Sequence, residues 1–139
     1  MSEKWSKWIP SKKVPAILYP EKIVDSNEGL FISFKNQSKS QNIIFIYDGT
    51  LFTYRNTEEG VFLRTIDYLH KNYSPDFYGE WSLFKVENSQ YLRWFNEESL
   101  GVYQDQNIEH YVFYTSDVII EVLSPYSPEI EIQDIASDA

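Results

Sequence analysis

Apolar residues in the first half of the chain occur in short β-rich runs separated by polar stretches. GLFISF (29–34) is followed by the polar KNQSKSQN (35–42), which we expect to be a loop. The next run, NIIFIYDGTLFTYR (42–55), contains Asp48-Gly49, a pair that favours the two-residue type I′ turn of a β-hairpin. The predicted cross-strand pairs are Tyr47 with Thr50, Phe45 with Phe52 and Ile43 with Tyr54.

The apolar spacing becomes helical after Thr57, which is a suitable N-cap for a helix over 58–72. WSLFKV (81–86) is then predicted to form a short strand. A second helix is predicted over 88–101, with Asn88 or Ser89 as N-cap and Gly101 as a favoured stop residue. The residues expected on the buried faces of the two helices are Phe62, Ile66, Leu69, Tyr73, Tyr91, Leu92 and Phe95.

The segment HYVFYTSDVIIEVLS (110–124) predicts a second hairpin around Ser116-Asp117. In that register His110 and Glu121 are diagonal neighbours on one face. The other face pairs Thr115 with Val118, Phe113 with Ile120 and Tyr111 with Val122. After Ser124 the prolines and acids allow an edge strand at most, and we expect a frayed tail within 125–139.

Strands and helices in this order predict an α+β fold, with an antiparallel β-sheet and about two α-helices packed on one side. The 139 residues are the size of one ordinary domain, and no linker divides them, so residues 1–139 are interpreted as a single domain. An aromatic share of 17% is enough to build the core from rings. Trp5 and Trp8 are expected to cap that core.

Charge is unevenly distributed along the chain. Residues 1–40 carry +3, whereas residues 41–139 carry five basic and seventeen acidic side chains, a net charge of −12. Such acidity repels phosphate backbones, which argues against direct nucleic-acid binding and favours a basic partner. Acidity also serves solubility alone, and that interpretation has about equal weight.

Several classes of chemistry lack their sequence signals. There is no cysteine, which excludes disulfides, thiolate catalysis and Cys-based metal sites. No phosphate-binding loop, zinc-protease motif, nucleophile elbow or calcium loop is present, so we expect no metal and no cofactor. Without a signal-peptide pattern or a long apolar run, a cytoplasmic protein that does not enter a membrane is expected.

His110 with Glu121 is the one pair that could orient an imidazole for general-base work. No nucleophile or oxyanion donor is designated nearby, so a structural cross-strand pair is favoured and catalysis is not expected. His70, near the end of the first predicted helix, suits the helix dipole. Carboxylates beside aromatic rings keep a small hydrolase or a carbohydrate-binding domain open as an alternative.

YSPDFYGEW (73–81) places aromatic rings beside acids and raises two interpretations. It is either a lid over a hydrophobic core or a surface loop with Trp81 turned inward and the polar side chains available to a partner. The acidic pair Glu97-Glu98 opposes the dipole of its own helix, which suggests a surface used for something else. The residues predicted to bind a partner are Asp76, Tyr78, Glu80, Glu97, Glu98 and Asp105.

In size, acidity, lack of cysteine and order of elements, and in the stretches WSLFKVENSQYLRWFNEESLG and HYVFYTSDVIIEVLS, the chain resembles small immunity proteins of bacterial contact-dependent inhibition and polymorphic-toxin systems. The resemblance rests on no diagnostic motif, so it transfers no residue role. It implies a non-catalytic inhibitor that binds a cognate protein toxin, which we expect to be a basic nuclease. A phage-type DNA mimic that blocks a nucleic-acid-binding protein is a further alternative.

Overall fold

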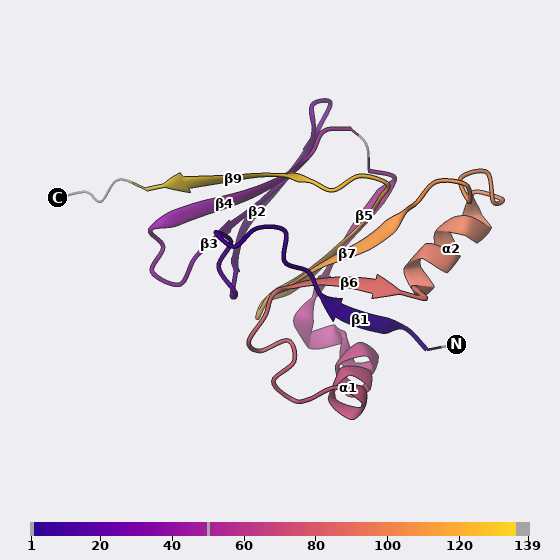
Figure 1. Ribbon diagram of the computed structural model, residues 1–139, viewed down its shortest axis with the longest axis horizontal. Helices are drawn as coiled ribbons and strands as arrows, with labels where there is room; N and C mark the ends of the chain where they lie inside the picture. The colour runs from indigo at the N-terminus through magenta and orange to yellow at the C-terminus, as the bar shows by residue number, and fades with distance from the viewer. Residues whose placement is uncertain (1, 50, 136–139) are drawn as a thin grey trace.

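The computed structural model describes residues 2–49 and 51–135. Within them the chain forms two antiparallel β-sheets and two α-helices, which confirms the predicted α+β class (Figure 1). The five-stranded sheet has the order β1-β6-β7-β8-β5. Its strands are β1 (Lys4–Lys7), β6 (Leu83–Glu87), β7 (Glu109–Tyr114), β8 (Val118–Ser124) and β5 (Thr53–Glu58).

The second sheet has four strands in the order β2-β3-β4-β9. These strands are β2 (Tyr19–Ser26), β3 (Gly29–Lys35), β4 (Gln41–Tyr47) and β9 (Glu129–Asp134). β9 pairs with β4 alone, so the predicted edge strand after Ser124 is confirmed. The predicted tail therefore contains a strand, and residues 136–139 lie outside the described residues.

The main core lies between the two sheets. Alternate residues of β7 and β8 point toward the four-stranded sheet, and the ring of Phe113 meets those of Phe34 and Phe45 at centroid distances of 5.6 and 4.9 Å. Trp8 packs in the same cluster, and Trp5 packs in a second one, so both tryptophans are buried as predicted. Burying such side chains contributes about 1.5–3 kcal/mol each.

Both helices pack on the outer face of the five-stranded sheet. α1 (Leu63–Asn72) buries Leu69 against Phe84 and Val112, whereas α2 (Gln90–Glu98) buries Tyr91 near Leu123. The molecule therefore has three layers, with helices, a middle sheet and an outer sheet, and the two helices cover different parts of the middle sheet (Figure 1).

The predicted 42–55 hairpin is wrong. β4 pairs with β3 and β9, while β5 crosses to the other sheet and pairs with β8. A type I′ turn needs positive φ at both central residues, but of the Asp48-Gly49 pair only Gly49 has it, at 84°. The predicted pairing of Tyr47 with Thr50 concerns a residue outside those described.

The first helix begins later than predicted. Thr57 belongs to β5, where it pairs with Ile119, and a 3₁₀ turn (Glu59–Val61) precedes α1. Sheet pairing has overridden the N-cap preference of Thr57. By contrast, the 110–124 hairpin is confirmed in its register, with Phe113 opposite Ile120 and Tyr111 opposite Val122.

Candidate functional site

A row of buried polar side chains lies on the outer face of the middle sheet, beside α2. His110 and Glu121 are only 2% and 1% exposed, and His110 Nε2 lies 2.7 Å from Glu121 Oε2. Because β7 and β8 pair in the predicted register, the two residues are diagonal neighbours, as expected. The same alternation that points Tyr111 into the main core points His110 toward α2.

Arg55 is the second hydrogen-bond partner of Glu121 and supplies a positive charge beside it. It lies directly opposite Glu121 across β5 and β8, and its Nε and Nη2 donate to the two carboxylate oxygens at 2.7 and 3.0 Å. Burial alone raises the pKa of Glu121, but the hydrogen bonds from His110 and Arg55, together with the positive charge of Arg55, hold it below its ordinary value. The guanidinium also lies 4.1 Å from the centre of the Tyr91 ring, which adds a cation–π contact.

Ser89 links this row to α2. It is the N-cap of the helix, as predicted, and its Oγ accepts a hydrogen bond from Leu92 N at 2.9 Å. The same oxygen lies 2.7 Å from His110 Nδ1. All contacts are satisfied when Ser89 donates to Nδ1 and His110 donates from Nε2 to Glu121. We name the buried residues Ser89, His110 and Glu121, together with the partly exposed Arg55, the polar row.

The order serine, histidine, carboxylate resembles a catalytic triad, but the surroundings differ from those of a nucleophile. Ser89 is buried, and its oxygen already serves the helix terminus. A triad serine is exposed to substrate beside oxyanion donors. The geometry supports the structural interpretation of the His110–Glu121 pair, which fixes α2 on the sheet.

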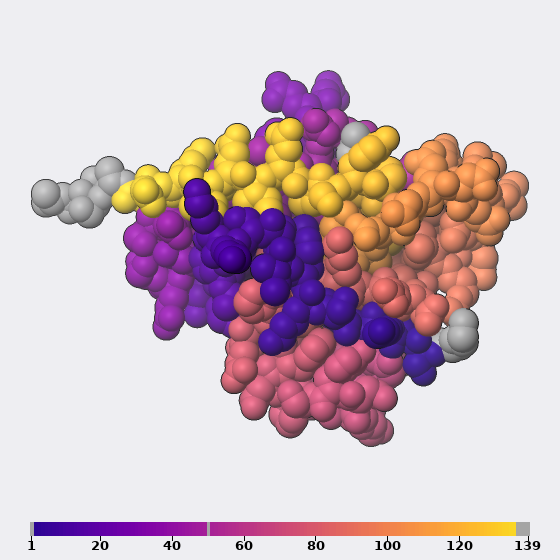
Figure 2. Space-filling view, viewed as in Figure 1, coloured from indigo at the N-terminus to yellow at the C-terminus, as the bar shows by residue number. Residues whose placement is uncertain are grey.

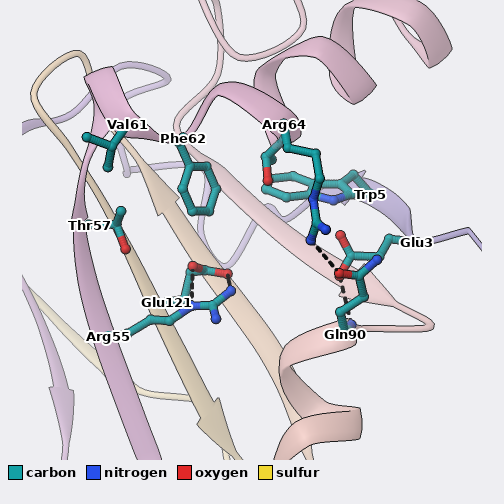
Figure 3. Close-up of a pocket in the computed structure, with 10 residues that line it drawn as sticks. Glu3, Trp5, Arg55, Thr57, Val61, Phe62, Arg64, Gln90 and Glu121 are labelled. Atoms are coloured by element: carbon teal, nitrogen blue, oxygen red, sulfur yellow. Dashed lines mark hydrogen bonds and ion pairs between the residues drawn. The ribbon is translucent and has the colours of Figure 1, made fainter.

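A cavity of about 260 Å³ lies between the helices, next to the polar row (Figure 3). Arg55, Thr57 and Glu121 of β5 and β8 form one side of it. The other side is formed by residues at the start of α1 and α2 and by the N-terminal segment. The residues that line this side include Phe62, Arg64, Thr65, Gln90, Glu3 and Trp5.

A second feature is the exposed surface of α2 and the loop after it, which projects as a lobe (Figure 2). Trp94 is 49% exposed, Leu100 89% and Val102 71%, although all three are large apolar side chains. Tyr103 lies over the ring of Phe52, at a centroid distance of 4.7 Å. We name the following residues the α2 surface: Trp94, Glu97, Glu98, Leu100, Val102, Tyr103 and Asp105.

The chain reverses direction within this surface. Leu100 and Gly101 both have positive φ, at 54° and 72°, and Gly101 N donates to Asn96 O at 2.8 Å. This is the glycine termination that the sequence predicts, although the helix itself ends at Glu98. The reversal leaves Leu100 pointing outward instead of into a core.

The predicted partner-binding residues fall into two groups. Glu97, Glu98 and Asp105 are exposed on the α2 surface, whereas Asp76 and Glu80 are exposed in the loop after α1, at a distant part of the molecule (Figure 1). Tyr78 is half-buried, stacks on Tyr114 at a centroid distance of 4.5 Å and bonds to His70. The structure therefore does not bring the six residues together.

The YSPDFYGEW segment covers a core. Tyr73, Phe77, Tyr78 and Trp81 all pack against the second apolar cluster, and the ring of Phe77 lies 4.7 Å from that of Phe84. Trp81 is turned inward, as expected, and donates from Nε1 to Trp8 O. Of the two interpretations of this segment, the lid describes its rings, while its acids remain exposed.

The acids after residue 40 do not all face outward, because Glu121 is buried. The described acidic residues also lie on α1, on α2, on β9 and in the loops, and β9 and α1 are on opposite sides of the molecule (Figure 1). Acidity is therefore spread over the exterior, and a partner surface must be identified by another property.

Sequence reasoning missed Arg55, Trp94 and Leu100. Arg55 could not be placed because its strand pairs with β8 rather than with β4. Trp94 and Leu100 could have been identified: Trp94 lies off the apolar face of the predicted helix, and Leu100 immediately precedes the stop residue Gly101.

Comparisons with protein-family models, curated proteins and solved structures find no match to this chain. In the described part of the chain no helix has the length and apolar character needed to cross a membrane. The same residues include no group of three or more histidine or acidic side chains placed to hold a metal ion.

Proposed function

We propose that this chain is a non-catalytic immunity protein that neutralises a basic toxin, a nuclease, by docking through the α2 surface. The observation that carries the proposal is the exposure of Trp94, Leu100 and Val102 among the carboxylates of that surface. Tryptophan is enriched among the few residues that supply most of the binding energy of protein interfaces, and acids around such an anchor select a basic partner.

The chemistry of a nuclease explains why such a surface inhibits. A nuclease site is basic because it holds phosphates, so carboxylates that enter it replace the substrate's charge. Glu97 and Glu98 lie in the last turn of α2, where they oppose the helix dipole. Their position costs helix stability, which fits a role in recognition.

The polar row supports the non-catalytic part of the proposal. Ser89, His110 and Glu121 are buried and hydrogen-bonded to one another, and His110 does not line the cavity between the helices. A hydrolase that used His110 would need it beside a space that substrate can enter. The row instead holds α2 in the position that presents its surface.

The test is to establish whether a gene adjacent to this one encodes a toxin, and then to co-express the two proteins. The wild-type chain is expected to restore growth, and the double variant E97K/E98K is expected to lose rescue because it places positive charge against a basic site. The double variant D76K/E80K makes the same charge change in the other loop and should retain rescue. Failure of the wild type to rescue would reject the function.

If wild type rescues, the two variants decide the surface. Equal loss in both would show that net charge alone matters, and full rescue by E97K/E98K would remove the α2 surface from the interface. Circular dichroism of each variant confirms that loss of rescue does not arise from unfolding.

A further inference from the structure

The cavity between α1 and α2 is lined mainly by hydrogen-bond donors with capacity to spare. Arg55 uses Nε and Nη2 on Glu121, and Arg64 uses Nη2 on Gln90 Oε1 at 2.7 Å, so each guanidinium keeps further N–H groups. The hydroxyls of Thr57 and Thr65 line the same space (Figure 3 shows the side chains around it).

Trp5 adds an unsatisfied donor. Its side chain is 4% exposed and lines this cavity, and its Nε1 has no hydrogen-bond partner among the described residues. Leaving a buried N–H unpaired costs about 1–3 kcal/mol, so such groups normally have a partner. An acceptor placed against this N–H would remove the cost.

The acceptors already present are largely occupied. Both oxygens of Glu121 bond to Arg55, and one of them also bonds to His110. Glu3 Oε2 accepts from Gln90 N at 2.8 Å, at the N-terminus of α2. The cavity therefore combines spare positive donors with few free acceptors.

From these observations we propose that the cavity binds a small oxyanion, a carboxylate or phosphate group, between Arg55, Arg64 and the indole N–H of Trp5. A volume of about 260 Å³ admits one such group and is smaller than the roughly 300–1,000 Å³ of sites for drug-sized ligands. The inference is independent of the proposed function, because the α2 surface contributes none of the lining residues.

Glu3 is the internal competitor for this site. Its Oε2 accepts the hydrogen bond of Gln90 N at the start of α2, so it already occupies an N–H group that an anion would use. A second cavity of about 420 Å³ shares Glu3, Arg64, Thr65 and Gln90 with the first, so these residues form the wall between the two spaces. Displacement of Glu3 opens a route for the anion from the second cavity.

The experiment is a titration of the purified protein with sodium phosphate and, separately, sodium acetate, each replacing chloride at constant ionic strength. The readout is the indole N–H resonance of Trp5 in ¹⁵N-edited NMR spectra, assigned by comparison with Trp5→Phe. Saturable movement of this resonance is expected with at least one anion. Phosphate alone identifies a phosphate site, and acetate alone a carboxylate site.

Three substitutions test which residues bind the anion. Arg64→Gln should weaken binding at least about tenfold, because it removes charged hydrogen bonds worth about 1.5–3 kcal/mol. Glu3→Gln should strengthen binding, because it removes the competing charge. Lys12→Gln makes the charge change of Arg64→Gln at a distant exposed residue and should leave binding unchanged.

Two results would overturn the proposal. One is the absence of saturable movement in both the wild type and Glu3→Gln. The other is an equal effect of Arg64→Gln and Lys12→Gln, which would show a general response to charge. Because no toxin is present, either result leaves the α2 surface untouched, and failed growth rescue leaves the oxyanion site untouched.

Discussion

The segments 73–81 and 94–105 have similar compositions, but the first packs against a core and the second stays largely exposed. Both contain three or more large apolar side chains beside acids. The rings of 73–81 lie over an apolar cluster of the middle sheet and become its cover. In 94–105 Phe95 and Tyr103 pack on Phe52 and Trp94 stacks on Tyr91, yet Trp94, Leu100 and Val102 remain exposed.

The difference arises from what each segment meets. α1 ends above Phe84 and Val112, so the loop that follows it closes over an apolar surface. α2 is fixed on the sheet partly through the polar row, and the reversal at Leu100 turns the loop away from the sheet. Composition alone therefore does not distinguish a lid from a docking surface.

Substitution in the polar row under α2 should lower the free energy of unfolding the most. Glu121→Ala removes the shared acceptor of Arg55 and His110, whose hydrogen bonds to the carboxylate are worth about 1.5–3 kcal/mol each, so we expect it to lower the free energy of unfolding by about 3–5 kcal/mol. Urea denaturation of this variant and of Glu131→Ala, an exposed glutamate on β9, measures the difference. A loss below about 1 kcal/mol would show that α2 is held by its apolar contacts alone.

Substitution of a ring in the lid, residues 73–81, should lower the free energy of unfolding by the next largest amount. Phe77→Ala removes a ring that packs on Tyr73 and Phe84, and we expect it to lower the free energy of unfolding by about 2–4 kcal/mol. Leu100→Ala should change it by no more than about 0.5 kcal/mol, because that side chain is exposed. Similar values for the two would contradict the contrast between lid and surface.

Affinity for the partner should depend on the α2 surface and not on the lid. Trp94→Ala is expected to weaken toxin affinity by about 2 kcal/mol, as for an aromatic hot spot, with little change in stability. Phe77→Ala, studied at a temperature where it is folded, should bind the toxin like the wild type. Calorimetric titration measures both affinities, and weaker binding by Phe77→Ala alone would assign the interface to 73–81.

Stability should also depend on acid through Glu121. Its pKa is lower in the folded chain than its ordinary value of 4.5, so its contribution is fully present above pH 4.5. That contribution is lost as the pH falls below 4.5 through the folded-state pKa. Denaturation midpoints of the wild type and Glu121→Gln between pH 3 and pH 7 should therefore converge in acid. A constant difference would contradict the assignment.

Local signals made part of this structure predictable. The two-residue turn at Ser116-Asp117 fixed the register of β7 and β8, and with it the His110–Glu121 pair. Ser89 was predictable as an N-cap because its side chain serves residues nearby in sequence. The fold class followed from the order of such local elements.

Long-range pairing was not predictable in the same way. Asp48-Gly49 favours a hairpin locally, yet β4 gains partners on both edges when β5 leaves for the other sheet. The position of Arg55 beside Glu121 depends on that crossing, and so does the cavity between the helices.

We propose that a toxin docks on the α2 surface and leaves the lid, residues 73–81, free. The direct measurement is amide hydrogen exchange of the chain with and without its toxin. Docking on the α2 surface should add protection at 94–105 and leave exchange at 73–81 unchanged. Protection of 73–81 with no change at 94–105 would contradict it.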